Sequence, residues 1–504
     1  MTRISSLIGS LCVVLALAGA AHGAVSFGVS EDRGKNGDAS AFFATLTDIG
    51  LNQNRVSIVW DPAQPNVIAG QDQIAAWLPA AQAAGVRVVF AITAKDARTL
   101  TSAGAPAQFA AFVRHVAETF PQVKDFVIGN EPNQPYFWLP QFDDLGRPVA
   151  AAAYEPVLAQ SYDALKAFDP TINVVGLGLS PRGNDNPNAR SNKSRSPVRF
   201  LHDLGVAYRA SHRTKPLMDE LAFHAYPLVN TDPPSTGYLW PNAGIPNLDR
   251  IKQAVWDAFN GTAQPTFAET GKARGAPLRL ELDELGWEVA VLPPLAGLYF
   301  GTENKPTIDE PTQAEYYAES IRLAECDPSV SSLSFFLLSD EPDLTHWQSG
   351  LERIDGSHRP SYDTVKQTIA QTHGNCQGAS ARWTHTTQVR SSFAAWGDLK
   401  HVRSRRATRW SFVVGAGEEA TFRAGVFKAG TSRRAITRSL ARGRPKPVLS
   451  AAGTIKAKKR VVIFRRRRLA PGRYRFAIRM RATMNPKRTR LIFSGVFAVG
   501  VRRR

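Results

Sequence analysis

The feature that most constrains the fold is a regular alternation of short apolar strands with helical segments between residue 25 and about residue 370. Each predicted strand is rich in Val, Ile, Leu or Phe and is bounded by turn residues, which is typical of parallel strands buried on both faces. The strands are expected at 25–29, 55–60, 86–93, 124–129, 173–179, 217–224, 277–285 and 331–338. Helical periodicity runs through the stretches between them, for example 73–84, 107–120, 153–168 and 311–324. Eight strands alternating with helices predict an α/β fold, a (β/α)₈ TIM barrel with enlarged loops.

A doubly wound open sheet is the alternative for an alternating chain of this kind. Such a sheet normally carries a Gly-rich turn after its first strand, but here the first strand runs into Ser30-Glu31-Asp32. The barrel is therefore the favoured prediction. One polar stretch, 182–196, follows the fifth strand and is predicted to be a long surface loop.

The pattern changes after residue 370. Residues 371–384 hold few apolar side chains and suit a linker. Strand-like runs then follow, and Gly, Pro and charged turns separate them, so that we expect no helix in this part of the chain. The runs are 409–414, 421–427, 454–464, 474–480 and 491–501. They predict a small all-β sandwich, immunoglobulin-like, over residues 385–504.

The charge is divided sharply along the chain. Residues 401–504 contain 30 Lys and Arg against two acidic residues, a net charge of +28, whereas the rest of the chain carries a net charge of −9. Clusters at 465–468 and 502–504 hold arginines alone. A surface of this kind would bind an anionic polymer, or it is simply a solvated cationic face. Nucleic acid is not favoured, because no aromatic residues interleave with the basic ones in a recognised motif.

The first residues have the layout of a secretory signal peptide. Arg3 precedes an apolar run at 7–21, and Ala21-His22-Gly23 provides a small-x-small cleavage signal. We expect a leader at residues 1–23 and a secreted protein that is extracellular or associated with the cell envelope. An uncleaved N-terminal anchor is the alternative. No later stretch is long and apolar enough to span a membrane.

Three cysteines are present, and Cys12 lies in the predicted leader. Cys326 and Cys376 remain as an even pair, which in an oxidising compartment would form one disulfide or stay as two unrelated thiols. The sequence contains no CxxC or HExxH pattern and no run of clustered His and Cys. We therefore expect no metal site and no cofactor.

Two strand ends carry the residues suited to chemistry. The predicted strand at 124–129 ends in Asn130-Glu131-Pro132, which places a carboxylate and an amide at its C-terminal tip. In a TIM barrel that face holds the active site. The strand at 277–285 ends in Glu281-Leu282-Asp283-Glu284, and we place Glu281 and Asp283 on opposite faces with Glu284 at the tip. Unpaired carboxylates are costly inside a barrel, so these acids need a function or a cationic partner.

These motifs resemble those of clan A glycoside hydrolases, especially the barrels of families 39 and 5. Asn130-Glu131-Pro132 matches the acid/base glutamate that ends strand four in that clan, and Glu284 matches the nucleophile that ends strand seven. His224 and Tyr226 resemble the His-x-Tyr of strand six. The resemblance covers roughly residues 24–370, the predicted catalytic region.

Three further residues extend the resemblance. Arg55 resembles the arginine of strand two, and it would pair either Glu284 or a structural acid. Trp347 follows strand eight, where a tryptophan that stacks on sugar is common in the clan. Trp138 follows strand four, and we expect both tryptophans to stack on sugar rings.

The resemblance implies a retaining glycosidase that cleaves an O-glycosidic bond of a polysaccharide or oligosaccharide. Glu284 would act as the nucleophile, and Glu131 as the acid/base, by double displacement. The additional acids of strand seven leave Asp283 as a second candidate for the nucleophile. The alternatives are a non-catalytic carbohydrate-binding protein on a glycosidase-like barrel and an envelope-interaction protein whose basic region carries the function. An anionic cell-envelope polymer is the partner that we expect for that region.

Overall fold

The computed structural model describes residues 24–272, 276–385, 395–404, 407–416, 419–456, 460–464, 469–483 and 489–499. The expected leader at 1–23 and the arginine clusters at 465–468 and 502–504 lie outside these residues. Within the described ranges, no helix combines the length and the apolar character that a membrane crossing would need.

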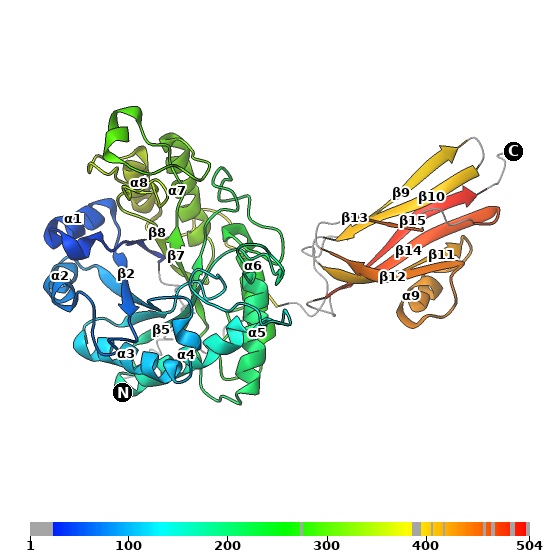
Figure 1. Ribbon diagram of the computed structural model, residues 1–504. Coiled ribbons are helices and arrows are strands. Elements are labelled where there is room, and N and C mark those ends of the chain that lie inside the picture. The colour runs from blue at the N-terminus through cyan, green and yellow to red at the C-terminus, as the bar shows by residue number, and fades with distance from the viewer. Residues whose placement is uncertain are drawn as a thin grey trace, which may run out of the picture.

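The first eight strands form a closed parallel barrel ringed by helices (Figure 1). The first strand pairs with both the second and the eighth, which excludes the open-sheet alternative and confirms the predicted TIM barrel. The strands are β1 (Ser26–Ser30), β2 (Gln53–Trp60), β3 (Arg87–Ala94), β4 (Asp125–Ile128), β5 (Asn173–Leu179), β6 (Glu220–His224), β7 (Arg279–Leu285) and β8 (Val330–Phe335). The helices are α1 (Ala39–Ile49), α2 (Gln71–Ala83), α3 (Ala105–Thr119), α4 (Ala150–Phe168), α5 (Pro197–Ala210), α6 (Leu248–Phe259), α7 (Glu310–Glu325) and α8 (Pro360–Thr372).

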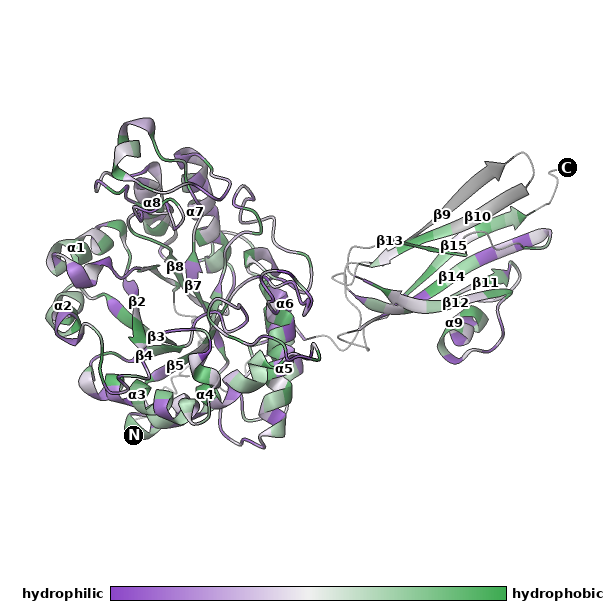
Figure 2. Cartoon of the chain, viewed as in Figure 1, coloured by the Kyte–Doolittle hydropathy of each residue, from purple (hydrophilic) through white to green (hydrophobic). Residues whose placement is uncertain are grey.

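The barrel strands contribute side chains to two separate regions, one between the strands and the helices and one inside the barrel. Apolar side chains that leave the strands outwards pack against the ring of helices in one large core, and Figure 2 shows the apolar character of these strands. Inside the barrel a small apolar cluster, which includes Val127 and Ala222, lies beside polar side chains. Gln53 donates a hydrogen bond to Glu281 at 2.6 Å, and Arg87 lies 3.6 Å from the same carboxylate. Glu281 therefore has a structural role in the barrel interior.

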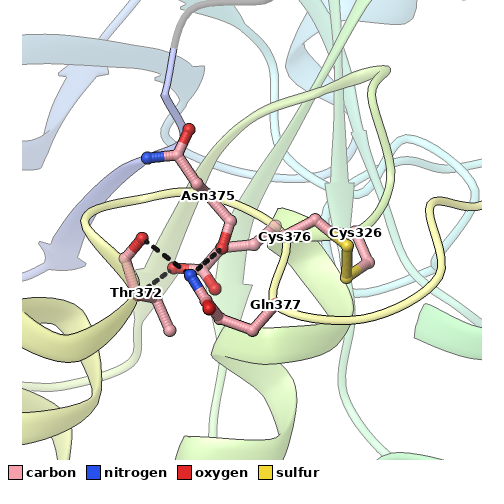
Figure 3. Close-up of a disulfide and its surroundings, with 6 residues drawn as sticks. Cys326, Thr372, Asn375, Cys376 and Gln377 are labelled. Atoms are coloured by element: carbon pink, nitrogen blue, oxygen red, sulfur yellow. Dashed lines mark hydrogen bonds between the residues drawn. A yellow bond between two sulfur atoms is a disulfide. The ribbon is translucent and has the colours of Figure 1, made fainter.

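Cys326 and Cys376 are bonded to each other in a disulfide, with Cα atoms 4.4 Å apart. Cys326 directly follows α7, and Cys376 comes shortly after α8 (Figure 3). Gln377 donates weak hydrogen bonds of 3.4 Å to the carbonyl oxygens of Thr372 and Asn375. The disulfide closes a loop that contains β8 and α8, so it fastens the segment after α8 to the end of α7.

The C-terminal part consists of two antiparallel sheets, as predicted. One sheet has the order β13-β10-β9 and the other β12-β11-β14-β15. Their facing side chains share one core, in which the rings of Phe412 and Phe476 stack at 3.8 Å. The strands are β9 (Ala395–Ser404), β10 (Ala407–Ala416), β11 (Ala420–Lys428), β12 (Leu449–Ile455), β13 (Arg460–Ile463), β14 (Gly472–Ala482) and β15 (Thr489–Val499).

Two sequence predictions for this region are wrong. The run at 454–464 is not one strand, because its two ends belong to β12 and β13 in different sheets. A helix, α9 (Arg433–Arg442), is also present where none was expected. Ser432 caps its first turn, Gly443 ends it in a left-handed conformation, and Ile436 and Leu440 form its buried face. Its many arginines obscured this short amphipathic pattern.

Candidate active site

Glu131 is held at the barrel mouth by a locked turn after β4. Gly129 has a φ of 89°, and Glu131 itself has a φ of 38°, in the left-handed region that side chains rarely adopt. The backbone N–H of Glu131 donates to the carbonyl of Gly178 at 2.9 Å, which ties the turn to the end of β5. A strained conformation of this kind costs about 1–3 kcal/mol and is typical of functional positions. Here it directs the carboxylate toward the axis of the barrel.

The acids of β7 reach the barrel interior in an unexpected way. Glu281 and Asp283 are fully buried and both point inward, so placing them on opposite faces is wrong. Residues two apart in a strand share a face. β7 has one residue more than β6 between Glu281 and Glu284, and one more than β8 between Leu282 and Leu285. This bulge turns Glu284 inward as well, beside Asp283, as bulges near active sites commonly do.

His224 joins these carboxylates. Its imidazole is fully buried, and Nδ1 lies 2.9 Å from Oε1 of Glu131 and 3.2 Å from Oε2 of Glu284. Nε2 lies 3.6 Å from the carboxylate of Asp283. Burial acts to lower the pKa of His224, but the carboxylates of Glu284 and Asp283 outweigh it and raise the pKa to about 10. The ring is therefore a cation at neutral pH.

Arg55 is a second buried cation in the site. Its Nη1 lies 3.0 Å from Glu284, and its Nε lies 3.1 Å from Asp283. Its Nη2 donates a hydrogen bond to Oδ1 of Asn130 at 2.7 Å. The sequence left open whether this arginine pairs Glu284 or a structural acid, and the structure shows that it pairs both. Asn130 is thereby fixed beside Glu131.

Tyr226 positions Glu284 from the other side. Its hydroxyl donates a hydrogen bond of 3.0 Å to Oε2 of Glu284, and its ring lies 4.7 Å from that of Trp347. Burial and the neighbouring carboxylates of Glu284 and Glu131 raise the pKa of Tyr226 well above its usual value. The phenol therefore keeps its proton and remains a hydrogen-bond donor.

The two adjacent acids of β7 differ in their proton affinity. Burial raises the pKa of Glu284, although the charges of His224 and Arg55 oppose it. Burial acts in the same direction on Asp283, but His224 and Arg55 outweigh it and lower the pKa of that carboxyl. Asp283 is thus the more acidic of the two carboxyl groups. The charge of Arg55 acts to lower the pKa of Glu284, but burial has the larger effect.

Two cavities meet at these residues. One, of about 780 Å³, is lined by Arg55, Asn130 and Glu284, and the other, of about 730 Å³, extends toward the loops after β5 and β6. The side chains common to both linings are Glu131, Tyr226 and Trp347. Asp283 and Glu281 line neither cavity, so Glu284 is the acid of β7 that a bound molecule can reach.

The two tryptophans that were predicted to stack on sugar rings lie in different surroundings. Trp347 is half-buried in the wall shared by the cavities, with the ammonium group of Lys305 lying 4.5 Å from the centre of its ring. Trp138 is only 2% exposed, and its ring meets that of Tyr154 edge to face. The expectation that Trp138 stacks on a sugar is wrong, because its ring fills the core beneath the loop.

Four acids that line the first cavity, Glu31, Asp32, Asp340 and Glu341, were overlooked in the sequence. Glu31 directly follows β1, lines the first cavity and accepts a hydrogen bond of 2.8 Å from the backbone of Arg33. Burial raises its pKa to about 7. The signal was available, because an acidic residue at the C-terminal end of a barrel strand is a candidate for the site.

In the described residues, no group of three or more His, Cys, Asp or Glu side chains is arranged to hold a metal ion.

Comparison with known proteins gives likenesses of fold. No family model matches the chain, and no curated protein matches it. Among solved structures, a family 39 glycoside hydrolase from Bacteroides cellulosilyticus WH2 is 16% identical, with 81% of this chain and 74% of that one covered and a TM-score of 0.49. A monomeric beta-xylosidase from Caulobacter crescentus CB15 is 15% identical, with 87% of this chain and 93% of that one covered and a TM-score of 0.42. GH5_18 from Streptomyces cattleya, solved in complex with GlcNAc, is 15% identical, with 73% of this chain and 83% of that one covered and a TM-score of 0.45. These neighbours are glycoside hydrolases, but likenesses this distant assign no activity.

Proposed function

We propose that this protein is a retaining glycoside hydrolase in which Glu284 is the nucleophile and Glu131 the acid/base. The observation that carries the proposal is the contact of both carboxylates with one atom, Nδ1 of His224, at 2.9 and 3.2 Å. At these distances the two contacting oxygens lie at most about 6 Å apart, which supports a short separation of the carboxyl groups over the roughly 6.5–9.5 Å typical of inverting enzymes. Retaining enzymes have their carboxyl groups about 5–5.5 Å apart, which fits this arrangement.

The first step would form a bond between Glu284 and the anomeric carbon of the sugar. The bond from that carbon to the leaving oxygen breaks, and Glu131 gives this oxygen its proton. Arg55 and Tyr226 contact the two oxygens of Glu284 separately, and they hold the carboxylate in position for attack. In the second step Glu131 takes a proton from water, whose oxygen displaces Glu284 from the sugar.

The cavities suggest how a glycan would lie. The cavity that Glu284 lines would hold the sugar whose bond is cleaved, because the nucleophile must reach its anomeric carbon. The second cavity shares Glu131 but not Glu284, so it suits the leaving group that receives the proton. Trp347 borders both, and its ring would contact a sugar at the point of cleavage.

The proposal extends to location. The predicted leader and the disulfide between Cys326 and Cys376 both support an exported protein, since disulfides persist in oxidising compartments. We propose that the enzyme acts on a carbohydrate outside the cytoplasm, with its basic C-terminal region in contact with an anionic polymer there.

The test is a panel of polysaccharides and aryl glycosides, with reducing sugar or released phenol as the readout. A 2-deoxy-2-fluoro glycoside of the best substrate should form a stable adduct, and peptide mass spectrometry should find it on Glu284. The adduct on another residue, or inversion at the anomeric carbon, would contradict the mechanism. Binding to a glycan without any release across the panel would favour a non-catalytic carbohydrate-binding protein instead.

A further inference from the structure

The outer face of the sheet β12-β11-β14-β15 is only partly covered. Ile436 and Leu440 of α9 pack on Phe427 and Ala477, which closes one half of that face. Beside the end of α9 a groove of about 440 Å³ remains open. Its lining includes Phe422, Arg423, Ala441, Arg479 and Arg481.

Three arginines dominate this groove. Arg423 of β11 lies directly opposite Arg479 of β14 in the register of the two strands, and Arg481 follows two residues further on the same face. Arg423 and Arg481 are exposed and Arg479 is half-buried. Figure 2 shows hydrophilic residues on β14 and on α9. The arginines therefore form a short row of guanidinium groups along the groove, which we call the arginine groove.

Among the described residues, no ion pair offsets the positive charge of the arginine groove. Like charges directly opposite each other destabilise a sheet, and no carboxylate among the described residues forms an ion pair with Arg423, Arg479 or Arg481. The guanidinium of Arg423 donates a long hydrogen bond of 3.4 Å to the carbonyl of Ala441. Burial and the two neighbouring arginines lower the pKa of Arg479. An anion bound in the groove would remove this repulsion.

We propose that the arginine groove binds the carboxylate groups of an acidic polysaccharide. The planar fork of an arginine matches a carboxylate with two parallel hydrogen bonds, and a row of arginines matches a polymer that repeats the charge. A nucleic acid fits less well, because single strands are held by stacking on aromatic rings and Phe422, the aromatic residue of the lining, is only 8% exposed. The proposal does not rest on hydrolase activity, since binding requires no turnover.

The experiment measures binding of the full chain to immobilised polygalacturonate, with neutral dextran as the blank. The variant Arg423→Gln/Arg479→Gln/Arg481→Gln should bind at least about tenfold more weakly, because it loses the charge-assisted hydrogen bonds of all three residues. The matched control is Arg434→Gln/Arg438→Gln/Lys446→Gln, which removes the same charge from exposed positions outside the lining. The control should lose less than about threefold, through long-range attraction alone.

A second measurement does not depend on how the variants fold. Phenylglyoxal modification of the native chain, read by peptide mass spectrometry, should be slowed at Arg423, Arg479 and Arg481 by polygalacturonate and not by dextran. Equal losses in the two triple variants, or equal labelling with and without polygalacturonate, would overturn the proposal. Tighter binding through these three arginines to polyphosphate or to double-stranded DNA would also overturn it, since the groove would then select phosphate.

Discussion

Glu131 and Glu284 end different strands, yet their carboxylates contact the same nitrogen of the His224 ring, at 2.9 and 3.2 Å. The other contacts of the two glutamates differ, and these contacts distinguish their proposed roles although the residue type is the same. Glu284 is also held by Arg55 and Tyr226, whereas Glu131 borders both cavities, which suits the acid/base role that we propose for it.

The first prediction compares the two carboxylates on substrates with different leaving groups. Glu284→Gln should remove turnover on all of them, because no other acid of β7 lines the cavity. Glu131→Gln should slow a poor leaving group by about 10²–10⁴-fold, the usual contribution of general acid catalysis. Cleavage of a dinitrophenyl glycoside should be affected far less, because that leaving group needs no proton. Equal losses on good and poor leaving groups would contradict the assignment of Glu131.

The second prediction concerns Asp283, the other candidate for the nucleophile. Asp283→Asn removes the buried charge that faces Arg55 and His224, so it should lower the free energy of unfolding by about 3–5 kcal/mol. Activity should fall but remain measurable at low temperature, where the variant is still folded. Urea unfolding and initial rates measure the two effects. If Glu284→Gln kept near-normal activity while Asp283→Asn lost it, the assignment of the nucleophile would be wrong.

The third prediction follows from the charge of His224. Its pKa is about 10 in the folded protein and about 6.5 when unperturbed, so the folded state holds a proton that the unfolded state releases between these values. The stabilisation from this group is complete below pH 6.5 and is lost as the pH rises toward 10, by at most about 1.4 kcal/mol per pH unit.

Urea unfolding at pH 6, 8 and 9.5 tests this sign. The difference in unfolding free energy between the native chain and His224→Gln should shrink as the pH rises, while the exposed His202→Gln should show no such trend. A neutral His224 ring at pH 8, detected by the ¹⁵N chemical shifts of the imidazole, would refute the prediction.

The fourth prediction concerns the disulfide. Cys326 and Cys376 are 50 residues apart, and opening a loop of this length costs about 2–4 kcal/mol of stability. Cys326→Ser/Cys376→Ser should lower the free energy of unfolding by this amount, measured by urea unfolding. Its KM should be unchanged, since neither residue lines the cavities. A changed KM would mean that the bond also shapes the site.

The barrel and much of the candidate site could be predicted because their signals are local. Short runs of apolar residues for the buried strands and helices of period 3.6 are visible in single windows of the sequence. An acid at a strand end lies at the barrel mouth in any TIM barrel. Glu131 was found in this way, and His224 by its resemblance to the His-x-Tyr of strand six; the structure brings them to 2.9 Å.

Other features depend on contacts between distant residues. The extra residue in β7 that turns Glu284 inward is visible only as a shift against β6 and β8. The pairing of Arg55 with two acids was left open for the same reason. The helix α9 was missed because its two buried apolar residues, Ile436 and Leu440, lie among arginines that look like a solvated turn.

The last prediction separates the two tryptophans that the sequence could not distinguish. Trp347→Ala removes a ring from the wall shared by both cavities, so KM should rise about tenfold, the value of one good aromatic contact. Trp138→Phe is the matched control, because this ring is 2% exposed and packs on Tyr154. It should lower stability by about 1–3 kcal/mol through imperfect packing and leave KM unchanged. Steady-state kinetics and thermal unfolding of both variants measure these effects. A rise in KM for Trp138→Phe with none for Trp347→Ala would mean that the sugar approaches from the β4 side of the mouth, and the placement of the glycan along the two cavities would have to be reversed.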